Sequence, residues 1–247
     1  MISLSRMLLL LSLLLGTSTL AQELTVEPRA DRLLKEMGAY LKGMDEFSFH
    51  IDTVEDQQSS SCWVEFGAAA DVFVRRPDGF KVARVGDKGR AQIFYDGKSV
   101  AIYNPDKQFY ARAEAPATIP ETLDFMHDKL GLTMPVADLL FPDSYEVLSE
   151  ETESGFYVGL HPVLGVPCHH LSFVSKSGME WQIWIEDGKM RVPRKLVIRH
   201  LDQPGVPRFA ALFSNWDANT PLARDLFFFE IPPEAQEIDF VIPKGTN

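Results

Sequence analysis

The chain has 247 residues, of which 45% are hydrophobic and 11% aromatic, and its formal net charge at pH 7 is -11. This composition excludes a disordered protein, because disordered chains lack the apolar residues needed for a core. An acidic chain with no cluster of lysine and arginine is also a poor candidate for binding nucleic acid or anionic membrane surfaces. The length suits one globular domain or two small ones.

The first 21 residues have the layout of a secretory signal peptide. Arg6 is their only charged residue, an apolar run from Met7 to Leu15 follows, and small residues precede Ala21. This order is typical of a signal that is removed on export. The run is shorter than the ~20 residues of a transmembrane helix, and no apolar stretch of that length follows it. We therefore expect cleavage after Ala21 and an exported protein that is not an integral membrane protein; an uncleaved N-terminal anchor is the alternative.

Residues 27–44 show the periodicity of one amphipathic helix. Pro28 suits its first turn and Gly43 is a suitable terminator. Apolar residues recur at three- and four-residue spacing and form one stripe: Leu33, Leu34, Met37, Tyr40, Leu41 and Met44. This stripe must be buried, and the β region that follows offers the face of a sheet.

Residues 47–113 contain short segments with strand periodicity, separated by turns of a few residues. Asp96-Gly97 is typical of such a hairpin turn. The spacing predicts an antiparallel meander. No helix of crossover length separates the segments, which argues against a parallel sheet.

Residues 118–141 interrupt the β pattern and predict a helical insert. Thr118 and Glu121 have the spacing of a capping box, and Pro120 suits the first turn of a helix. Residues 135–141 predict a second, shorter helix. The apolar sides of these two helices are suited to cover the concave side of the sheet.

Strand patterns resume after the insert and continue the meander. They comprise residues 145–148, 156–160, 168–174, 179–186, 193–201 and 209–216, and an edge strand over residues 225–229 that is ended by two prolines.

The predicted hairpin over residues 168–186 has apolar side chains on both of its faces. Alternation along its second strand places Trp181, Ile183 and Ile185 on a core face, whereas Trp184 lies on the otherwise polar face. A sheet with apolar side chains on both faces needs cover on both, by helices, by another sheet or by a ligand.

The two cysteines and a histidine pair are the candidates for chemistry. Cys62 and Cys168 either form a disulfide in the oxidising compartment or remain independent thiols, and the sequence leaves both readings open. His169 and His170 are adjacent on a strand, so they point to opposite faces and cannot easily share a metal. Cys168 and His170 share a face, but the usual two-residue spacer between metal ligands is missing. We expect ordinary sheet residues here, with no metal, no cofactor and no catalytic group; a hydrolase or metal-binding protein using Cys168 and His170 is a distant alternative.

Six motifs in order carry a resemblance to a known family. They are R-R-P-D-G-F from Arg75 to Phe80, F-Y-D-G-K from Phe94 to Lys98, P-V-A-D-L-L from Pro135 to Leu140, G-V-P-C-H-H-L from Gly165 to Leu171, W-Q-I-W-I-E from Trp181 to Glu186 and P-R-K-L-V-I from Pro193 to Ile198. This set resembles the pattern of a domain-of-unknown-function family of predicted periplasmic bacterial proteins. That family in turn resembles the lipoprotein-carrier fold of LolA and LolB.

The resemblance implies a fold and a location. The expected fold is mainly β with helices (α+β): a curved antiparallel sheet, or incomplete β-barrel, covered by the N-terminal helix and the central insert. It would form a single domain over residues 22–247, with the insert at residues 118–141, in the periplasm. Such a fold implies a cavity for acyl chains or another apolar ligand, although a fold does not by itself establish a function.

We therefore expect a non-catalytic periplasmic binding or carrier protein for a lipid-like ligand, gated by the insert. The predicted ligand-binding residues are Trp184, Leu123, Met126, Leu139 and Phe94. The alternative is an interaction or sensing module with a filled core, whose partner is another envelope protein.

Overall fold

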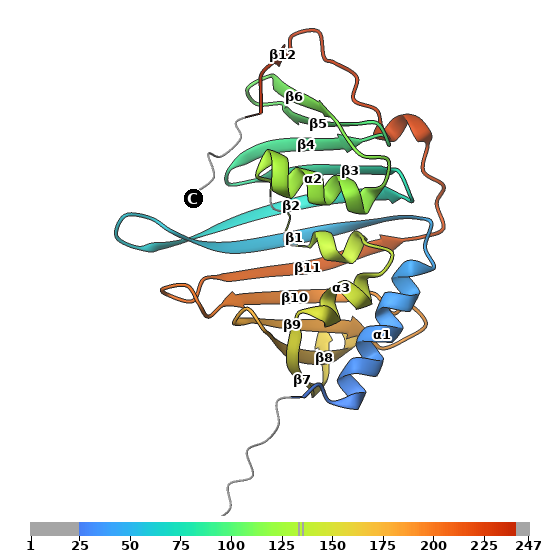
Figure 1. The fold of residues 1–247 in the computed structure, drawn as a ribbon, viewed down its shortest axis with the longest axis vertical. Coiled ribbons are helices and arrows are strands. Elements are labelled where there is room, and N and C mark those ends of the chain that lie inside the picture. Colours follow the sequence, from blue (N-terminus) through green and yellow to red (C-terminus); the bar gives the residue numbers. More distant parts are fainter. Residues whose placement is uncertain (1–24, 133, 135, 241–247) are drawn as a thin grey trace, which may run out of the picture.

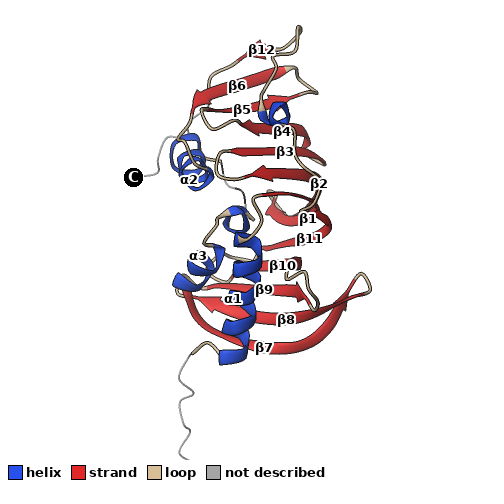
Figure 2. Cartoon of the chain, turned by 90° about the vertical axis from the view of Figure 1, so that its right-hand side faces the viewer, coloured by secondary structure: helices blue, strands red, loops and turns tan. Residues whose placement is uncertain are grey.

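The computed structural model describes residues 25–132, 134 and 136–240. The predicted signal peptide, residues 1–21, lies outside the described residues. In the described part, twelve strands form one sheet, and the helices α1, α2 and α3 lie on one face of it (Figures 1 and 2). We call this face, toward which the curved sheet bends, the concave face, and the other the convex face. The expected fold class, a curved and open antiparallel sheet with helices, is confirmed.

The sheet consists of two meanders that are joined along one pair of strands. The strand order is β12-β6-β5-β4-β3-β2-β1-β11-β10-β9-β8-β7, and β1 pairs with β11 in antiparallel fashion. The strands are β1 Glu46–Gln58, β2 Trp63–Arg75, β3 Gly79–Gly86, β4 Gly89–Tyr95, β5 Ser99–Asn104, β6 Phe109–Glu114, β7 Thr152–Val163, β8 Val166–Ser175, β9 Met179–Glu186, β10 Pro193–His200, β11 Arg208–Asp217 and β12 Gln236–Glu237.

The helices occupy the positions that their sequence signals indicate. Helix α1 is Pro28–Lys42 and buries the predicted apolar stripe against the sheet. Helix α2 is Ile119–Leu130, and the Thr118 hydroxyl accepts a hydrogen bond from the Glu121 backbone N–H, which confirms the predicted cap. The remaining helical elements are the 3₁₀ turn η1 Ala137–Leu140, the helix α3 Ser144–Glu150 and the 3₁₀ turn η2 Arg224–Phe227.

Two predicted strands are wrong. Residues 145–148 belong to α3, because the Tyr145 hydroxyl donates to Asp31 of α1 at 2.7 Å and so holds this segment on α1, away from the sheet. That hydrogen bond raises the pKa of Tyr145 to about 12. Residues 225–229 do not form an edge strand, because Phe227 of η2 is fully buried against Gly79. The edge is instead formed by β12, which pairs with β6 in parallel fashion.

The hairpin of β8 and β9 follows the predicted alternation. Trp181 is 4% exposed, and Ile183 and Ile185 are fully buried on the concave side. Their cross-strand neighbours on β10 include Leu196, which faces Ile183, and Ile198, which faces Trp181. The core therefore lies between this part of the sheet and the helices.

Both cysteines are free thiols in the structure. Cys62 is exposed in the loop that joins β1 to β2, and Cys168 is fully buried on β8.

Helix α1 approaches α3 closely at Gly38. A Cβ atom at this position would lie 2.6 Å from the Tyr145 Cβ and 3.1 Å from its backbone nitrogen. We expect Gly38→Ala to lower the free energy of unfolding by about 1–3 kcal/mol, the usual cost of overpacking, although alanine is the better helix former by about 1 kcal/mol. Urea denaturation measures the difference.

Gly43→Ala is the matched control for this substitution. Gly43 has φ -75° and ψ -2°, which alanine adopts freely, and a Cβ atom there would lie 3.5 Å from the nearest atom. This variant should be neutral or more stable by about 0.4–1 kcal/mol. Equal effects of the two substitutions would contradict the close packing of α1 on α3.

Candidate functional site

An apolar cavity lies between the concave face and the helical insert. Its volume is about 300 Å³, at the lower end of the range of about 300–1,000 Å³ that is usual for ligand sites. Side chains from five strands and from residues 134–140 line this first cavity: Phe49, Ile51, Thr53, Glu55, Phe66, Ala68, Ala70, Val72, Val82, Arg84, Ala91, Ile93, Met134, Val136, Ala137, Leu140 and Phe209.

The first cavity exists because small side chains face the insert at this part of the sheet. Ala68 and Ala70 of β2 and Ala91 of β4 contribute little volume to its floor, and Ala137 contributes little to its roof. Elsewhere the concave face carries large buried side chains, such as Phe80, Tyr95, Trp181 and Phe213, which fill the space beneath the helices. Close packing therefore fails locally, where alanines meet from separate strands.

A second cavity of about 300 Å³ lies on the other side of η1. It is lined by residues of the insert, α3 and strands β8, β9 and β10: Val136, Asp138, Leu139, Val147, Leu148, Glu151, Ser175, Met179, Trp181, Ile183, Leu196 and Ile198. Leu139 faces the second cavity, Leu140 faces the first and Val136 lines both. The turn η1 is thus a thin wall between the two cavities.

Arg76 holds one end of this wall in place. Its Nη1 donates to the carbonyls of Leu41 and Met44, each at 2.6 Å. Its Nη2 donates to the carbonyls of Leu140 and Phe141, at 3.1 and 3.4 Å. One guanidinium therefore joins the end of α1 to the end of η1. Burial lowers the pKa of Arg76, but an arginine remains charged in proteins, so these hydrogen bonds are charge-assisted.

The start of the insert is held by separate contacts. The Tyr95 hydroxyl donates to the Pro116 carbonyl at 2.7 Å, and the Ile119 backbone N–H donates to the Pro77 carbonyl at 2.9 Å. The insert is therefore tied to the sheet at both of its ends, with α2 and η1 between the ties.

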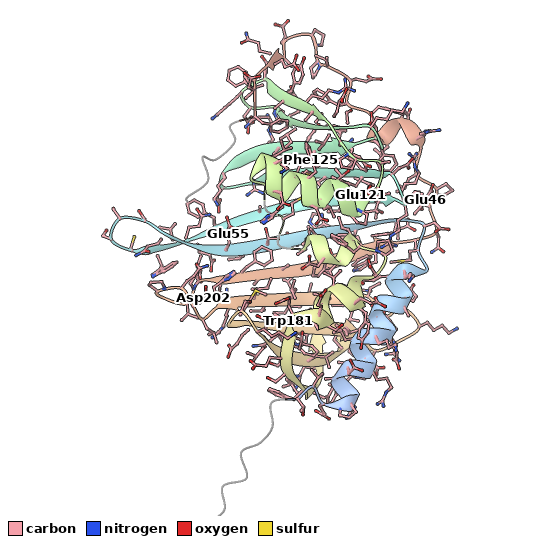
Figure 3. The ribbon with its side chains drawn as sticks, in the orientation of Figure 1. Glu46, Glu55, Glu121, Phe125, Trp181 and Asp202 are labelled. Atoms are coloured by element: carbon pink, nitrogen blue, oxygen red, sulfur yellow. The ribbon has the colours of Figure 1, made fainter. Side chains whose placement is uncertain are left out.

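The charged side chains of the first cavity lie near the turns that join β1 to β2 and β3 to β4. Glu55 lies on β1 on the hairpin side of the insert, whereas Trp181 lies on β9 beside α3 (Figure 3). The Lys88 ammonium forms an ion pair with Glu55 and lies 4.9 Å from the centre of the Phe66 ring. The Arg84 Nη1 donates only a long hydrogen bond, 3.5 Å, to the Gly89 carbonyl. The cavity therefore has an apolar interior and a charged end.

The five predicted ligand-binding residues do not form one group. Leu139 lines the second cavity. Leu123 and Met126 are buried in the core beneath α2 and line neither cavity. Phe94 and Trp184 lie on the convex face, where Phe94 packs 5.4 Å from the centre of the Phe229 ring and Trp184 belongs to a small separate apolar cluster.

The convex-face cluster around Trp184 explains how that side chain is covered. The His170 ring stacks on Trp184 at 3.8 Å between centres, and the Lys195 ammonium lies 4.5 Å from the Trp184 ring. Cys168 is buried in the same cluster. Burial raises the pKa of the Cys168 thiol and lowers the pKa of His170, a combination that works against a thiolate nucleophile. Within the described residues, no three side chains of the histidine, cysteine, aspartate and glutamate types form a group that could hold a metal ion.

The sequence prediction missed the alanines, Arg84 and Arg76. The alanines had a signal, because Ala68, Ala69 and Ala70 are consecutive in a strand and the alternation of side chains places Ala68 and Ala70 on one face. Arg76 lies in the motif that starts at Arg75, but its bonding partners are distant in the sequence. No local pattern indicates them.

Comparison with known families and curated proteins gives one match. A family model described as a predicted periplasmic protein (DUF2092) matches residues 30–241. Comparison with curated protein sequences gave no match. Among the helices that the structure describes, none has both the length and the apolar character to cross a bilayer.

Solved structures share the fold at low sequence identity. The lipoprotein LppX of Mycobacterium tuberculosis is similar, with a TM-score of 0.51 and 14% identity, over 80% of this chain and 100% of that one. An uncharacterized conserved protein of Thermus thermophilus is similar at a TM-score of 0.50 and 10% identity, over 85% and 99% of the two chains. A LolA superfamily protein of Nitrosomonas europaea matches at a TM-score of 0.40 and 8% identity, over 81% and 97%. The first two likenesses concern the fold alone.

Proposed function

The chain belongs to the DUF2092 family of predicted periplasmic proteins, and from this premise we propose that it is a non-catalytic binding or carrier protein for a lipid-like ligand. The location agrees with the expected periplasmic one. The ligand would lie on the concave face, in the cavities on either side of η1.

The observation that carries the proposal is the pair of apolar cavities. Protein interiors are close-packed, and a core that only stabilises the fold leaves few voids larger than a water molecule. Here two cavities of about 300 Å³ each, both partly open to solvent, remain beneath one short insert. Filling them with an acyl chain would bury apolar surface on both partners, at about 25 cal/mol per Å². Apolar burial alone is therefore a sufficient driving force for binding.

The insert is suited to act as a lid. The wall between the cavities is a single 3₁₀ turn, and its side chains face one cavity or the other. A small displacement of η1 would join the two cavities into one. Arg76 binds the last residue of η1 and Tyr95 binds the start of the insert, so the movement would be confined to the segment between these two contacts. Lids of this kind move about a few residues at their ends.

We expect Val82→Trp to weaken binding of a fluorescent fatty acid by tenfold or more. Val82 lies on β3 and lines the first cavity, so the larger ring would occupy the space of the ligand. The measurement is a fluorescence titration of delipidated protein, with circular dichroism to show that the variant is folded.

Val85→Trp is the matched control, with the same substitution on the same strand. Val85 is 54% exposed and lies on the convex side, so the ring would point into solvent. Unchanged binding in Val82→Trp would place the ligand elsewhere. No binding by the unaltered protein at any chain length would instead favour the alternative, an interaction module for another envelope protein. Mass spectrometry of organic extracts from protein purified from its native envelope would identify the natural ligand.

A further inference from the structure

Arg84 is an unpaired cation in the wall of an apolar cavity. Among the residues that the structure describes, no carboxylate oxygen lies within 4.0 Å of its guanidinium. Its hydrogen bond to the Gly89 carbonyl is long, at 3.5 Å. Five other arginines of this acidic chain do form ion pairs: Arg75, Arg90, Arg191, Arg194 and Arg208. A guanidinium has five N–H donors, so Arg84, which lines the first cavity, has donors left for a ligand.

The other charged side chains at this end of the cavity already have partners. Glu55 also lines the cavity, but its carboxylate is neutralised by Lys88 and accepts a further hydrogen bond from Gln57 at 3.1 Å. The side chains of Lys88 and Glu55 are about one-third exposed, which places this end of the cavity at the water boundary. Asp87 of the same turn accepts a hydrogen bond from the Gly67 backbone N–H at 2.7 Å. Arg84 is thus the charged residue of the cavity lining that has no ion-pair partner among the described residues.

The opposite end of the cavity is apolar and buried. Phe49 is 3% exposed, Val72 is 4% exposed and Leu140 is 4% exposed. The cavity therefore changes from a hydrated end that carries Arg84 to a dry apolar end. This gradient matches a molecule that has one charged end and one hydrocarbon end.

We infer that the ligand is an anionic amphiphile with a single acyl chain, whose carboxylate or phosphate pairs with Arg84 while its chain extends toward Phe49. The inference rests on the proposed function and names the ligand class for the same site. The planar guanidinium binds both kinds of anionic group through paired hydrogen bonds. A neutral head group would leave the donors of Arg84 without this compensation. The volume of about 300 Å³ holds the first part of one acyl chain, and a long chain also needs the second cavity on the other side of η1.

The test compares ligands that share a palmitoyl chain and differ in their head group. Palmitate carries a carboxylate, 1-palmitoyl lysophosphatidate carries a phosphate, and 1-monopalmitoylglycerol is uncharged. Isothermal titration calorimetry with delipidated, folded protein gives each dissociation constant at low and high salt. The anionic ligands should bind on the order of tenfold more tightly than the neutral one, because a hydrogen bond to a charged group contributes about this much. The preference should shrink at high salt, since the pair lies at the water boundary. The anionic ligand with the lower dissociation constant identifies the preferred head group.

The key variant is Arg84→Gln, and its matched control is Arg90→Gln. Arg90 lies on the adjacent strand β4 on the convex side, is half-exposed and pairs with Asp106, so its loss changes the net charge equally without touching the cavity. Arg84→Gln should remove the preference for anionic ligands, Arg84→Lys should keep part of it, and Arg90→Gln should keep all of it.

The outcomes separate the two proposals. The head-group inference is wrong if the unaltered protein binds palmitate, lysophosphatidate and the glycerol ester equally and Arg84→Gln leaves their relative affinities unchanged. The carrier proposal would still stand in that case. If the unaltered protein binds none of the three ligands, the carrier proposal itself fails. A loss of preference in both glutamine variants would mean that overall charge, and not Arg84, attracts the anion.

Discussion

Replacing Arg76 by methionine is expected to lower the free energy of unfolding by about 3–5 kcal/mol. The substitution removes two 2.6 Å hydrogen bonds from a charged donor, each worth about 1.5–3 kcal/mol. It also leaves the carbonyls of Leu140 and Phe141 without their donor. The Arg76 guanidinium also lies over the Phe47 ring, with Cζ 5.1 Å from the ring centre, and this contact is lost with the charge. Methionine keeps an apolar side chain at this position, which limits the loss of packing.

Urea denaturation of the folded protein measures this change as a lower midpoint at constant slope. The matched control is Arg90→Met, in which an exposed ion pair with Asp106 is lost. Exposed pairs contribute about 0–1 kcal/mol, so this variant should remain close to the unaltered protein. Equal midpoints for the two variants would show that Arg76 does not join α1 to the insert.

Replacing Trp181 by alanine is expected to cost about 3–5 kcal/mol of unfolding free energy, the range for large aromatic side chains in cores. Trp181 is 4% exposed, and its ring stacks on Phe173 with 4.2 Å between centres and an angle of 19°. It also lines the second cavity. Truncation would therefore enlarge an existing void, which the surrounding strands cannot close.

The control for Trp181→Ala is Phe156→Ala, because Phe156 is 56% exposed on β7. An exposed truncation should change stability by about 0.5 kcal/mol or less. Trp181→Phe should fall between the two, since it keeps an aromatic ring against Phe173. If Trp181→Ala lowers the free energy of unfolding by less than about 1 kcal/mol, Trp181 faces a ligand or solvent and does not pack in the core.

The packing of the protein interior helps to distinguish a ligand carrier from an interaction module with a filled core. Aromatic side chains do fill part of the concave face, where Phe47, Phe49, Phe213 and Trp216 stack on one another. Beneath η1 the same face has alanines and two cavities. The protein thus combines a packed core that stabilises the sheet with a separate region that has room for a ligand.

Local patterns in the sequence determined the elements that depend on neighbouring residues. The stripe of α1 and the cap of α2 at Thr118 need only a few adjacent residues, and both are confirmed. The alternation of β9 is likewise confirmed, with Trp181 toward the core and Trp184 toward the other face. Short turns between consecutive strands made both meanders antiparallel, because parallel strands need long crossovers.

Only the tertiary structure decided the rest. Residues 145–148 include a tyrosine, a valine and a leucine that suit a strand, but the contact between Tyr145 and Asp31 holds this segment on α1, in α3. A cavity is space left between segments that are distant in the chain, so no window of sequence contains it. The first cavity needs Ala68, Ala91 and Ala137 to meet, and within the described residues no carboxylate pairs with Arg84. The sequence determined which side chains share a face; the packing of the insert on the sheet decided where space and unpaired charge remain.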